Sequence, residues 1–150
     1  MDIKTVSKNR KALFEYSILD TLEAGISLKG SEIKSIRAGQ VSLQEAYILI
    51  EKSEAWLVNS HIASYDAASY ANHDPKRPRR LLLHKKEIYD LGMSVKQKGV
   101  TIIPIRMYLK EGRAKLEIAI AKGKKLYDKR QDIAEKDMKR DIDRAMNKRD

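Results

Sequence analysis

The 150-residue sequence contains no cysteine. This absence excludes a disulfide framework, a zinc site built on thiolates and a cysteine nucleophile. The sequence also lacks long hydrophobic runs: no stretch has the length needed to cross a bilayer, and the first residues lack the apolar segment of a secretory signal. A reducing compartment is compatible with this composition, and we predict a cytoplasmic protein.

The motifs of common catalytic sites are absent as well. There is no GxxxxGK[ST] phosphate loop, no GxGxxG after a strand and no GxSxG, so nucleotide hydrolysis, hydride transfer and acyl transfer have no motif support. No two of the histidines His61, His73 and His84 stand four residues apart on an expected helix, as a metal pair would. We predict that the protein is not an enzyme and uses neither a metal nor a cofactor.

Positive charge, by contrast, is abundant. Lys and Arg number 31 against 21 Asp and Glu, so the formal net charge is +10. Residues 121–150 hold eleven of the cations and seven of the anions, so both this segment and the rest of the chain are basic. A polyanion is the natural partner, and nucleic acid is favoured over a membrane surface because no stretch forms a long basic helix with a bulky apolar face.

Alternation of apolar and polar residues predicts several strands. Phe14, Tyr16 and Ile18 alternate with polar neighbours, and the same parity resumes after Asp20, which predicts one long strand bent by a bulge and by Gly25. Residues 46–50 and 55–62 predict a hairpin, as do 101–108 and 114–121 around a four-residue connection. Antiparallel strands in this number favour a small closed barrel, because closure hides edge strands.

Two short helices are expected beside these strands. Gly30-Ser31 offers an N-cap for residues 32–37, and Gly39 is placed to end that helix, whose Lys34 and Arg37 lie on a different face from its isoleucines. The apolar spacing of Ile88, Leu91 and Val95 predicts a second helix that stops at Gly99. The prediction is therefore a mostly β domain with two to three flanking helices.

Residues 63–80 lack periodicity and end in a cluster of cations. Pro75-Lys76-Arg77-Pro78-Arg79-Arg80 holds four cations between and after two prolines, followed by Leu81-Leu82-Leu83 as an anchor. Guanidinium groups suit bidentate contact with phosphate, so we interpret the segment as a tether that contacts an RNA backbone. A plain solvated loop is the alternative interpretation.

The character of the sequence changes at Gly123. We divide the chain into residues 1–122, an RNA-binding barrel, and residues 123–150, a basic C-terminal tail. The tail has a narrow apolar stripe near helical spacing, at Ala134, Met138, Ile142 and Ala145 or Met146, so we expect it to be disordered when free and helical when bound. A solvated exit from the domain is the alternative interpretation of this segment.

Several spaced blocks together resemble one known family, the SsrA-binding proteins, also called small protein B. The matching blocks are Asn9-Arg10-Lys11-Ala12 with Glu15-Tyr16, Glu23-Ala24-Gly25-Ile26, Glu32-Ile33-Lys34-Ser35-Ile36-Arg37-Ala38-Gly39, Asp74-Pro75 through Leu83, and Gly123-Lys124-Lys125 with Asp128-Lys129-Arg130. Two positions depart from the pattern: Phe14 stands where many members carry His, and Tyr127 stands where some do.

The resemblance implies an OB-type barrel that binds the tRNA-like domain of transfer-messenger RNA and brings it, with elongation factor Tu bound through the RNA, to stalled ribosomes for trans-translation and ribosome rescue. It further implies that the tail enters the small-subunit decoding centre and the empty message channel. The candidate RNA-binding residues, including the cations above, are Asn9, Arg10, Lys11, Glu23, Lys34, Arg37, Arg77, Arg79, Arg80, Leu82, Lys124 and Lys125. The candidate ribosome-binding residues of the tail are Tyr127, Asp128, Lys129, Arg130, Lys136, Arg144 and Met146.

Two other functions are compatible with a basic barrel. A general structured-RNA-binding or ribosome-associated protein would select no particular RNA, and competition by bulk tRNA would reveal it. An RNA-processing enzyme would need a titrating group, which single histidine substitutions would expose.

Overall fold

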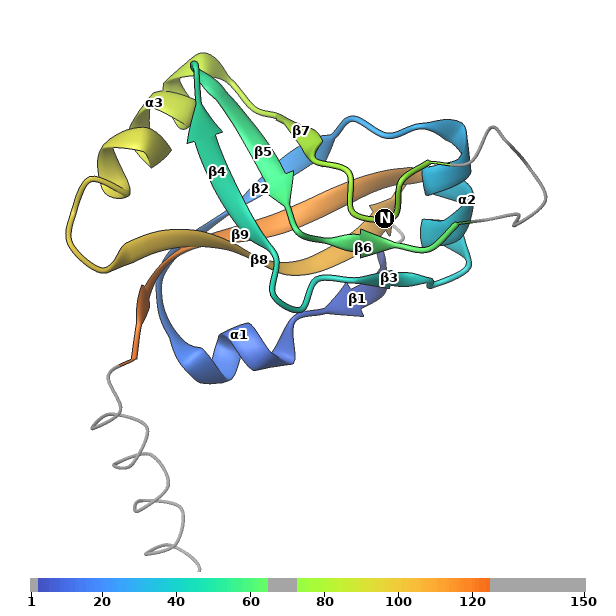
Figure 1. Ribbon diagram of the computed structural model, residues 1–150, viewed down its shortest axis with the longest axis horizontal. Coiled ribbons are helices and arrows are strands. Elements are labelled where there is room, and N and C mark those ends of the chain that lie inside the picture. The colour runs from blue at the N-terminus through green and yellow to red at the C-terminus, as the bar shows by residue number, and fades with distance from the viewer. Residues whose placement is uncertain (1–2, 65–72, 125–150) are drawn as a thin grey trace, which may run out of the picture.

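The computed structural model describes residues 3–64 and 73–124 (Figure 1). These residues form a mostly β fold with three helices. The elements in chain order are β1 (Ile3–Lys8), α1 (Arg10–Glu15), β2 (Tyr16–Ile26), α2 (Gly30–Arg37), β3 (Val41–Ser42), β4 (Tyr47–Glu51), β5 (Glu54–Val58), β6 (His61–Ile62), β7 (Arg79–Leu82), α3 (Lys85–Ser94), β8 (Val100–Lys110) and β9 (Arg113–Gly123).

Seven of the strands form one antiparallel sheet in the order β1-β8-β9-β2-β7-β5-β4, and β3 pairs with β6 beside it. The sheet curves so that β4 and β5 pass over β8 and β9 (Figure 1). Among the described residues β1 and β4 remain its two edges, with no pairing between them. The predicted mostly β fold of antiparallel strands is confirmed, whereas the predicted closure into a small barrel is not.

The main core lies inside this curve. It is lined by fully buried aliphatic side chains, among them Leu57, Ile102, Leu116 and Ile118. A second, smaller core lies on the opposite face of β8 and β9, where Ala12 of α1 covers Ile103 and Ala119. Helix α1 thus covers one end of that opposite face, and the side chains at the other end form the face described in the next section.

Both predicted hairpins are confirmed, and each closes through a tight two-residue turn. Lys52 and Ser53 join β4 to β5 with φ of 50° and 62°, and Glu111 and Gly112 join β8 to β9 with φ of 52° and 79°. Positive φ at both central residues is the mark of the type I′ turn, whose twist matches that of the paired strands.

The strand predicted to begin at Phe14 begins later, because residues 10–15 form α1. The Asn9 side chain accepts a hydrogen bond from the Ala12 amide at 3.2 Å, which caps this helix and outweighs the alternation that suggested a strand. From Tyr16 onward the long strand is confirmed, with a register shift between Ile18 and Asp20 where the bulge was expected.

The two predicted helices are confirmed as α2 and α3. Gly39, just beyond α2, has φ of 75° and supplies the left-handed conformation that most readily ends a helix. The helix predicted to stop at Gly99 ends earlier, at Ser94, and Gly99, with φ of 80°, lies in the turn that leads into β8. Within the part of the chain that the structure describes, no helix is long and apolar enough to span a membrane.

Candidate nucleic-acid interface

Beyond α1, the face of the sheet turned away from the main core carries polar and half-exposed side chains. We call this the outer face and define it by Glu23 of β2, Leu82 of β7, Arg106 and Tyr108 of β8, and Lys115 of β9. Register places them on one side: Glu23 and Arg106 both stand opposite Glu117, and Lys115 stands opposite both Gly25 and Tyr108. Side chains directly opposite one another in antiparallel strands share a face.

Glu23 is an acidic residue of this face and is partly exposed, with 40% of its side chain accessible. Its Oε2 accepts a hydrogen bond from the Tyr108 hydroxyl and lies 3.6 Å from the Lys110 ammonium. The hydrogen bond from Tyr108 is the main cause that holds the pKa of Glu23 below its ordinary value, and Lys110 and Lys115 act in the same direction. Glu23 is therefore a fixed, ionised acceptor at the surface.

Leu82 is the apolar counterpart of Glu23 on the outer face. Half of it is exposed, whereas its neighbour Leu81 is buried in the main core. Leu82 pairs with Gly25, where an added Cβ would lie 3.2 Å from the Leu82 Cβ. The missing side chain at Gly25 thus lets β7 and the Leu82 side chain lie close over β2.

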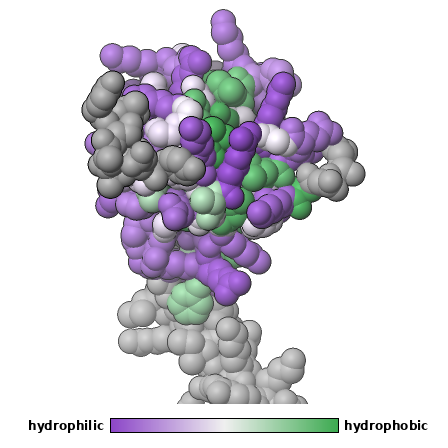
Figure 2. Space-filling view, turned by 90° about the vertical axis from the view of Figure 1, so that its right-hand side faces the viewer, coloured by the Kyte–Doolittle hydropathy of each residue, from purple (hydrophilic) through white to green (hydrophobic). Residues whose placement is uncertain are grey.

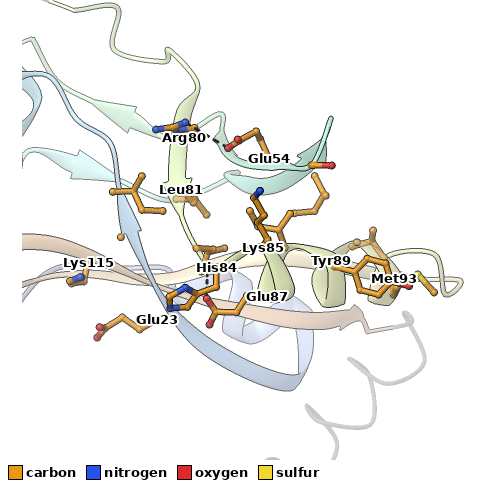
Figure 3. Close-up of a pocket in the computed structure, with 18 of the residues that line it drawn as sticks. Glu23, Glu54, Arg80, Leu81, His84, Lys85, Glu87, Tyr89, Met93 and Lys115 are labelled. Carbon is orange, nitrogen blue, oxygen red and sulfur yellow. Dashed lines mark hydrogen bonds and ion pairs between the residues drawn. The ribbon is translucent and has the colours of Figure 1, made fainter.

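Two hollows meet at Leu82. The larger, about 1290 Å³, lies between the outer face and α3 and is called the α3 groove; Glu23 and Lys115 lie at one end of it and Tyr89 and Met93 at the other (Figure 3). The smaller, about 360 Å³, is called the α2 hollow and is bounded by α2, the end of β2 and the β8–β9 turn. Leu82 lines both, so it forms the ridge between them.

Both hollows combine apolar walls with cations. Arg80, Lys85 and Lys115 line the α3 groove beside the exposed Tyr89 ring, and Arg113 lines the α2 hollow. At the end of the molecule that carries α2, apolar side chains form a band between hydrophilic ones (Figure 2). Cations that reach phosphate beside apolar and aromatic surfaces that contact bases are the combination by which single-stranded or structured RNA is bound.

Residues 75–80, predicted to be a tether that contacts phosphate, expose only some of their cations in the structure. Arg79 lies in β7 and is fully buried, with its Nε donating to Glu32 Oε2 at 2.7 Å. Arg77 donates from Nη2 to Glu32 Oε1 at 2.5 Å and is about one quarter exposed. Arg80 is half exposed on the outer face, 4.0 Å from Glu54. The prediction of direct phosphate contact is therefore wrong for Arg79, and Arg80 is the arginine of this cluster best placed for it.

Glu32 is the centre of this buried cluster. Burial alone would raise the pKa of Glu32, but hydrogen bonds from Arg77, from the Lys29 amide and from Arg79 outweigh burial and hold that pKa below its ordinary value. Arg79 also donates from Nη1 to the carbonyl and the hydroxyl of Ser60, at 3.2 and 3.1 Å. The cluster ties three parts of the fold together from inside the protein: α2, Ser60 just before β6, and β7.

Asn9 is a second predicted RNA contact that the structure places in the interior. Only 4% of the residue is exposed, and its Nδ2 donates to the carbonyls of Leu43 and Pro104 at 3.1 and 3.0 Å. Its amide donates to Ile105 at 2.7 Å, beside the register shift in β8. Direct contact between Asn9 and RNA is therefore corrected to a structural role, in which Asn9 caps α1 and pins it to the irregular part of β8.

The other predicted contacts are spread over several surfaces. Arg10 and Lys11 are exposed on α1, where Lys11 forms an ion pair with Glu45. Lys34 and Arg37 are exposed on α2. Lys124 is half-buried, and its amide donates to the Glu15 carbonyl at 2.9 Å. None of these five residues lines either hollow, whereas Glu23, Arg80 and Leu82 do.

The remaining candidates lie outside the described residues. They are Lys125, Tyr127, Asp128, Lys129, Arg130, Lys136, Arg144 and Met146.

One histidine is buried in the fold, and the other two are exposed. His73 is buried, with Nε2 2.8 Å from the Ile62 carbonyl, to which Nε2–H donates, and Nδ1 2.8 Å from the Ser31 hydroxyl. His61 lies in β6 and His84 precedes α3. Across residues 3–64 and 73–124 no group of three His, Asp or Glu side chains is arranged to hold a metal ion.

The motifs missed four residues of the candidate interface: Tyr89 and Lys115, which line the α3 groove, and Tyr108 and Lys110, which hold Glu23. For β8, alternation along the strand could have indicated this face, because every second residue near its end is polar or aromatic: Arg106, Tyr108 and Lys110. A strand that is polar on one parity and apolar on the other presents the polar face outward, and that face was open to identification before the structure.

Comparison with known proteins gives consistent results over nearly the whole chain. The model of the SmpB protein family matches residues 6–148. An SsrA-binding protein of Desulforudis audaxviator is 54% identical over 142 residues, which cover 95% of this chain and 93% of the relative. An SsrA-binding protein of Pelotomaculum thermopropionicum is 50% identical over 149 residues, covering 99% and 97%. A chain from a solved structure concerned with tmRNA-SmpB and the bacterial ribosome is similar with a TM-score of 0.68 and 48% identity, covering 79% of this chain and 84% of that one.

Proposed function

This chain belongs to the SmpB family of SsrA-binding proteins, and from that premise we propose that it binds transfer-messenger RNA and acts with it on the ribosome in trans-translation. The observation that carries the proposal is the family match over residues 6–148, supported by relatives about half identical in sequence. The family consists of RNA-binding proteins and not of enzymes, so the protein acts by binding and delivery.

The outer face supports this function physically. Arg80, Lys85 and Lys115 line the α3 groove, where they supply the charge that phosphate contact requires. Leu82 and Tyr89 offer exposed apolar and aromatic surface to unstacked bases, and Glu23 offers an acceptor to base or ribose donors. We assign the tRNA-like domain of the RNA to this face.

The remaining parts of the proposal rest on the family resemblance. Residues 123–150 act as a separate basic tail that reaches the small-subunit decoding centre and the message channel, although residues 125–150 lie outside the described structure. Elongation factor Tu joins through the RNA, and the protein works in the cytoplasm. The curved seven-stranded sheet corresponds to an OB-type barrel in this proposal, with β1 and β4 as the strands that would complete it.

A competition experiment tests the proposed function. The full chain is titrated with labelled transfer-messenger RNA in 150 mM salt, and unlabelled bulk tRNA is added as competitor. The protein is expected to keep the labelled RNA when tRNA is in large excess, because specific RNA sites exceed the general electrostatic attraction that all RNAs share. Release at equal concentrations of the two RNAs would instead identify a general RNA-binding protein.

A further inference from the structure

Tyr108 is almost completely buried although it belongs to the outer face. Only 3% of the residue is exposed. The Arg106 guanidinium lies 4.4 Å from the centre of its ring, and Arg106 is itself held by Glu117 at 2.8 Å and by the Thr5 hydroxyl at 3.2 Å. Cation–π contact and the ion pair together fix the ring from β1, β8 and β9. The hydroxyl of Tyr108 is therefore held in one place at the edge of the α3 groove.

That hydroxyl donates to Glu23 Oε2. The Lys110 ammonium lies beside the same oxygen, at 3.6 Å, so both described partners of the carboxylate engage Oε2. Oε1 has neither of these two partners, and Glu23 lines the groove and is 40% exposed, so its carboxylate is accessible to a bound RNA. The two contacts at Oε2 thus restrain the orientation of the whole carboxylate, including Oε1.

A carboxylate on an RNA-binding surface is unfavourable unless it accepts hydrogen bonds, because phosphates repel it. An exposed Glu also loses side-chain entropy when binding immobilises it, and prior fixation avoids part of this loss. The surrounding charges suit the role: Lys110 and Lys115 face Glu23 from β8 and β9, and Glu117, directly opposite, is neutralised by Arg106. Glu23 is the outer-face carboxylate whose charge is not consumed in an arginine pair.

We propose that Tyr108 is a positioning residue for RNA selection: its buried hydroxyl fixes Glu23 so that Oε1 accepts a hydrogen bond from an unpaired base or a ribose hydroxyl of the bound RNA. This inference rests on the proposed function. Tyr108 itself is too buried to contact RNA and acts through Glu23.

Removal of the hydroxyl alone tests the inference. Tyr108→Phe keeps the ring and its contact with Arg106, so the fold is retained. Affinity for transfer-messenger RNA should fall about 3- to 10-fold, the range expected for one hydrogen bond that orders a charged acceptor, while affinity for bulk tRNA should change little. Tyr47→Phe removes an exposed hydroxyl outside the outer face and should change neither affinity.

Two further measurements separate positioning from a general structural effect. In Tyr108→Phe the pKa of Glu23, followed by carboxyl NMR, should rise toward its ordinary value, because its largest stabilising hydrogen bond is gone. In a Glu23→Ala background, Tyr108→Phe should cause no further loss of RNA affinity.

Each contrary outcome points to a different failure. If the wild-type protein does not prefer transfer-messenger RNA over tRNA, the proposed function is overturned, and this inference falls with it. If the wild type shows the preference but Tyr108→Phe binds as tightly, or if the losses from Tyr108→Phe and Glu23→Ala simply add, then Tyr108 does not position Glu23 for RNA.

Discussion

Arg79 and Glu32 form an ion pair in which both side chains are fully buried, with Arg79 Nε 2.7 Å from Glu32 Oε2. The pair joins β7 to α2, two elements that are 47 residues apart at this point in the sequence. Successive side chains of β7 point to opposite faces of the sheet. Because Arg79 and Leu81 are buried, Arg80 and Leu82 therefore point outward. The pair therefore sets the orientation of the strand that contributes most directly to the candidate interface.

Glu32→Gln should destabilise the protein strongly while leaving no surface charge altered. Breaking a buried pair leaves the two arginines without their anion, and such a loss typically costs about 3 to 5 kcal/mol of the free energy of unfolding. Urea denaturation at pH 7 measures the cost. Glu45→Gln, which breaks the exposed pair with Lys11, is the matched control and should have little effect.

The same substitution should also change how stability depends on pH. The pKa of Glu32 is lower in the folded than in the unfolded chain. The ionised carboxylate therefore contributes fully to the free energy of unfolding above the unfolded pKa of about 4.3, and this contribution is lost as the pH falls through the folded pKa. Denaturation curves from pH 7 down to pH 3 should therefore lose less stability in Glu32→Gln than in the wild type. An equal acid loss in both proteins would show that Glu32 is not held ionised by the arginines.

Neighbouring leucines should separate folding from binding. Leu82→Ala removes a half-exposed side chain, so RNA affinity should fall with little change in thermal stability. Leu81→Ala opens a cavity in the main core and should cost about 2 to 5 kcal/mol of the free energy of unfolding. Calorimetry and RNA titration of both variants check this, and a Leu82→Ala protein with wild-type affinity would remove Leu82 from the interface.

Arg80→Ala should flatten the dependence of RNA affinity on salt. Removing one cation that neutralises a phosphate reduces the slope of log affinity against log salt by roughly 0.7 to 0.9. Lys86→Ala, which removes an exposed cation of α3 that does not line the groove, serves as control. The slope from 50 to 300 mM salt should change in the first variant more than in the second; equal slopes would mean that Arg80 is only solvated. Arg79 is unsuitable for such a test, because its removal leaves Glu32 buried without one of its two arginine partners.

Much of the fold followed from local patterns in the sequence. The two hairpins, the long β2 with its bulge, and the two helices α2 and α3 were predicted, because alternation, spacing and glycine position act over a few residues. The end of α3 was predicted too late, at Gly99 instead of Ser94. The α1 helix was missed because its cap depends on Asn9, whose side chain is held by β8, 95 residues away in the sequence at Pro104. Whether the curved sheet closes depends on its edge strands, which no local pattern specifies.

The candidate site was predicted less well, because a motif does not distinguish a buried charge from an exposed one. Four cations at residues 76–80 suggested phosphate contact, and nothing in their composition showed that Arg79 pairs with Glu32 in the interior. Alternation was the available signal: Arg79 shares a parity with the buried Leu81, and Arg80 shares one with the exposed Leu82. Glu32 stands four residues before Ile36, so the two side chains share one face of α2. This spacing indicated that Glu32 is buried and could pair with a buried arginine.

Deletion of residues 131–150 should separate RNA binding from action on the ribosome. Within residues 3–64 and 73–124, both cores draw their buried residues from positions up to Ala121, and β9 ends at Gly123, so the truncated protein should remain folded and bind its RNA. Release of stalled ribosomes, which the proposal assigns to the tail, should be abolished. Replacement of Ile142 and Met146 by Asp is a milder version that retains most of the basic charge. A more than tenfold loss of RNA affinity on truncation, about 1.4 kcal/mol, would show that the tail belongs to the folded body.

The most direct test of the central claim is to sequence the RNA that co-purifies with the protein from its own cells, using the wild type and a Glu23→Ala, Leu82→Ala double variant. Transfer-messenger RNA should dominate the wild-type sample far beyond its share of cellular RNA. The double variant, whose changes lie on the outer face, should lose that enrichment. Wild-type RNA that mirrors the cellular abundance of tRNA and rRNA, or an enrichment that persists in the double variant, would contradict selection of transfer-messenger RNA by this face.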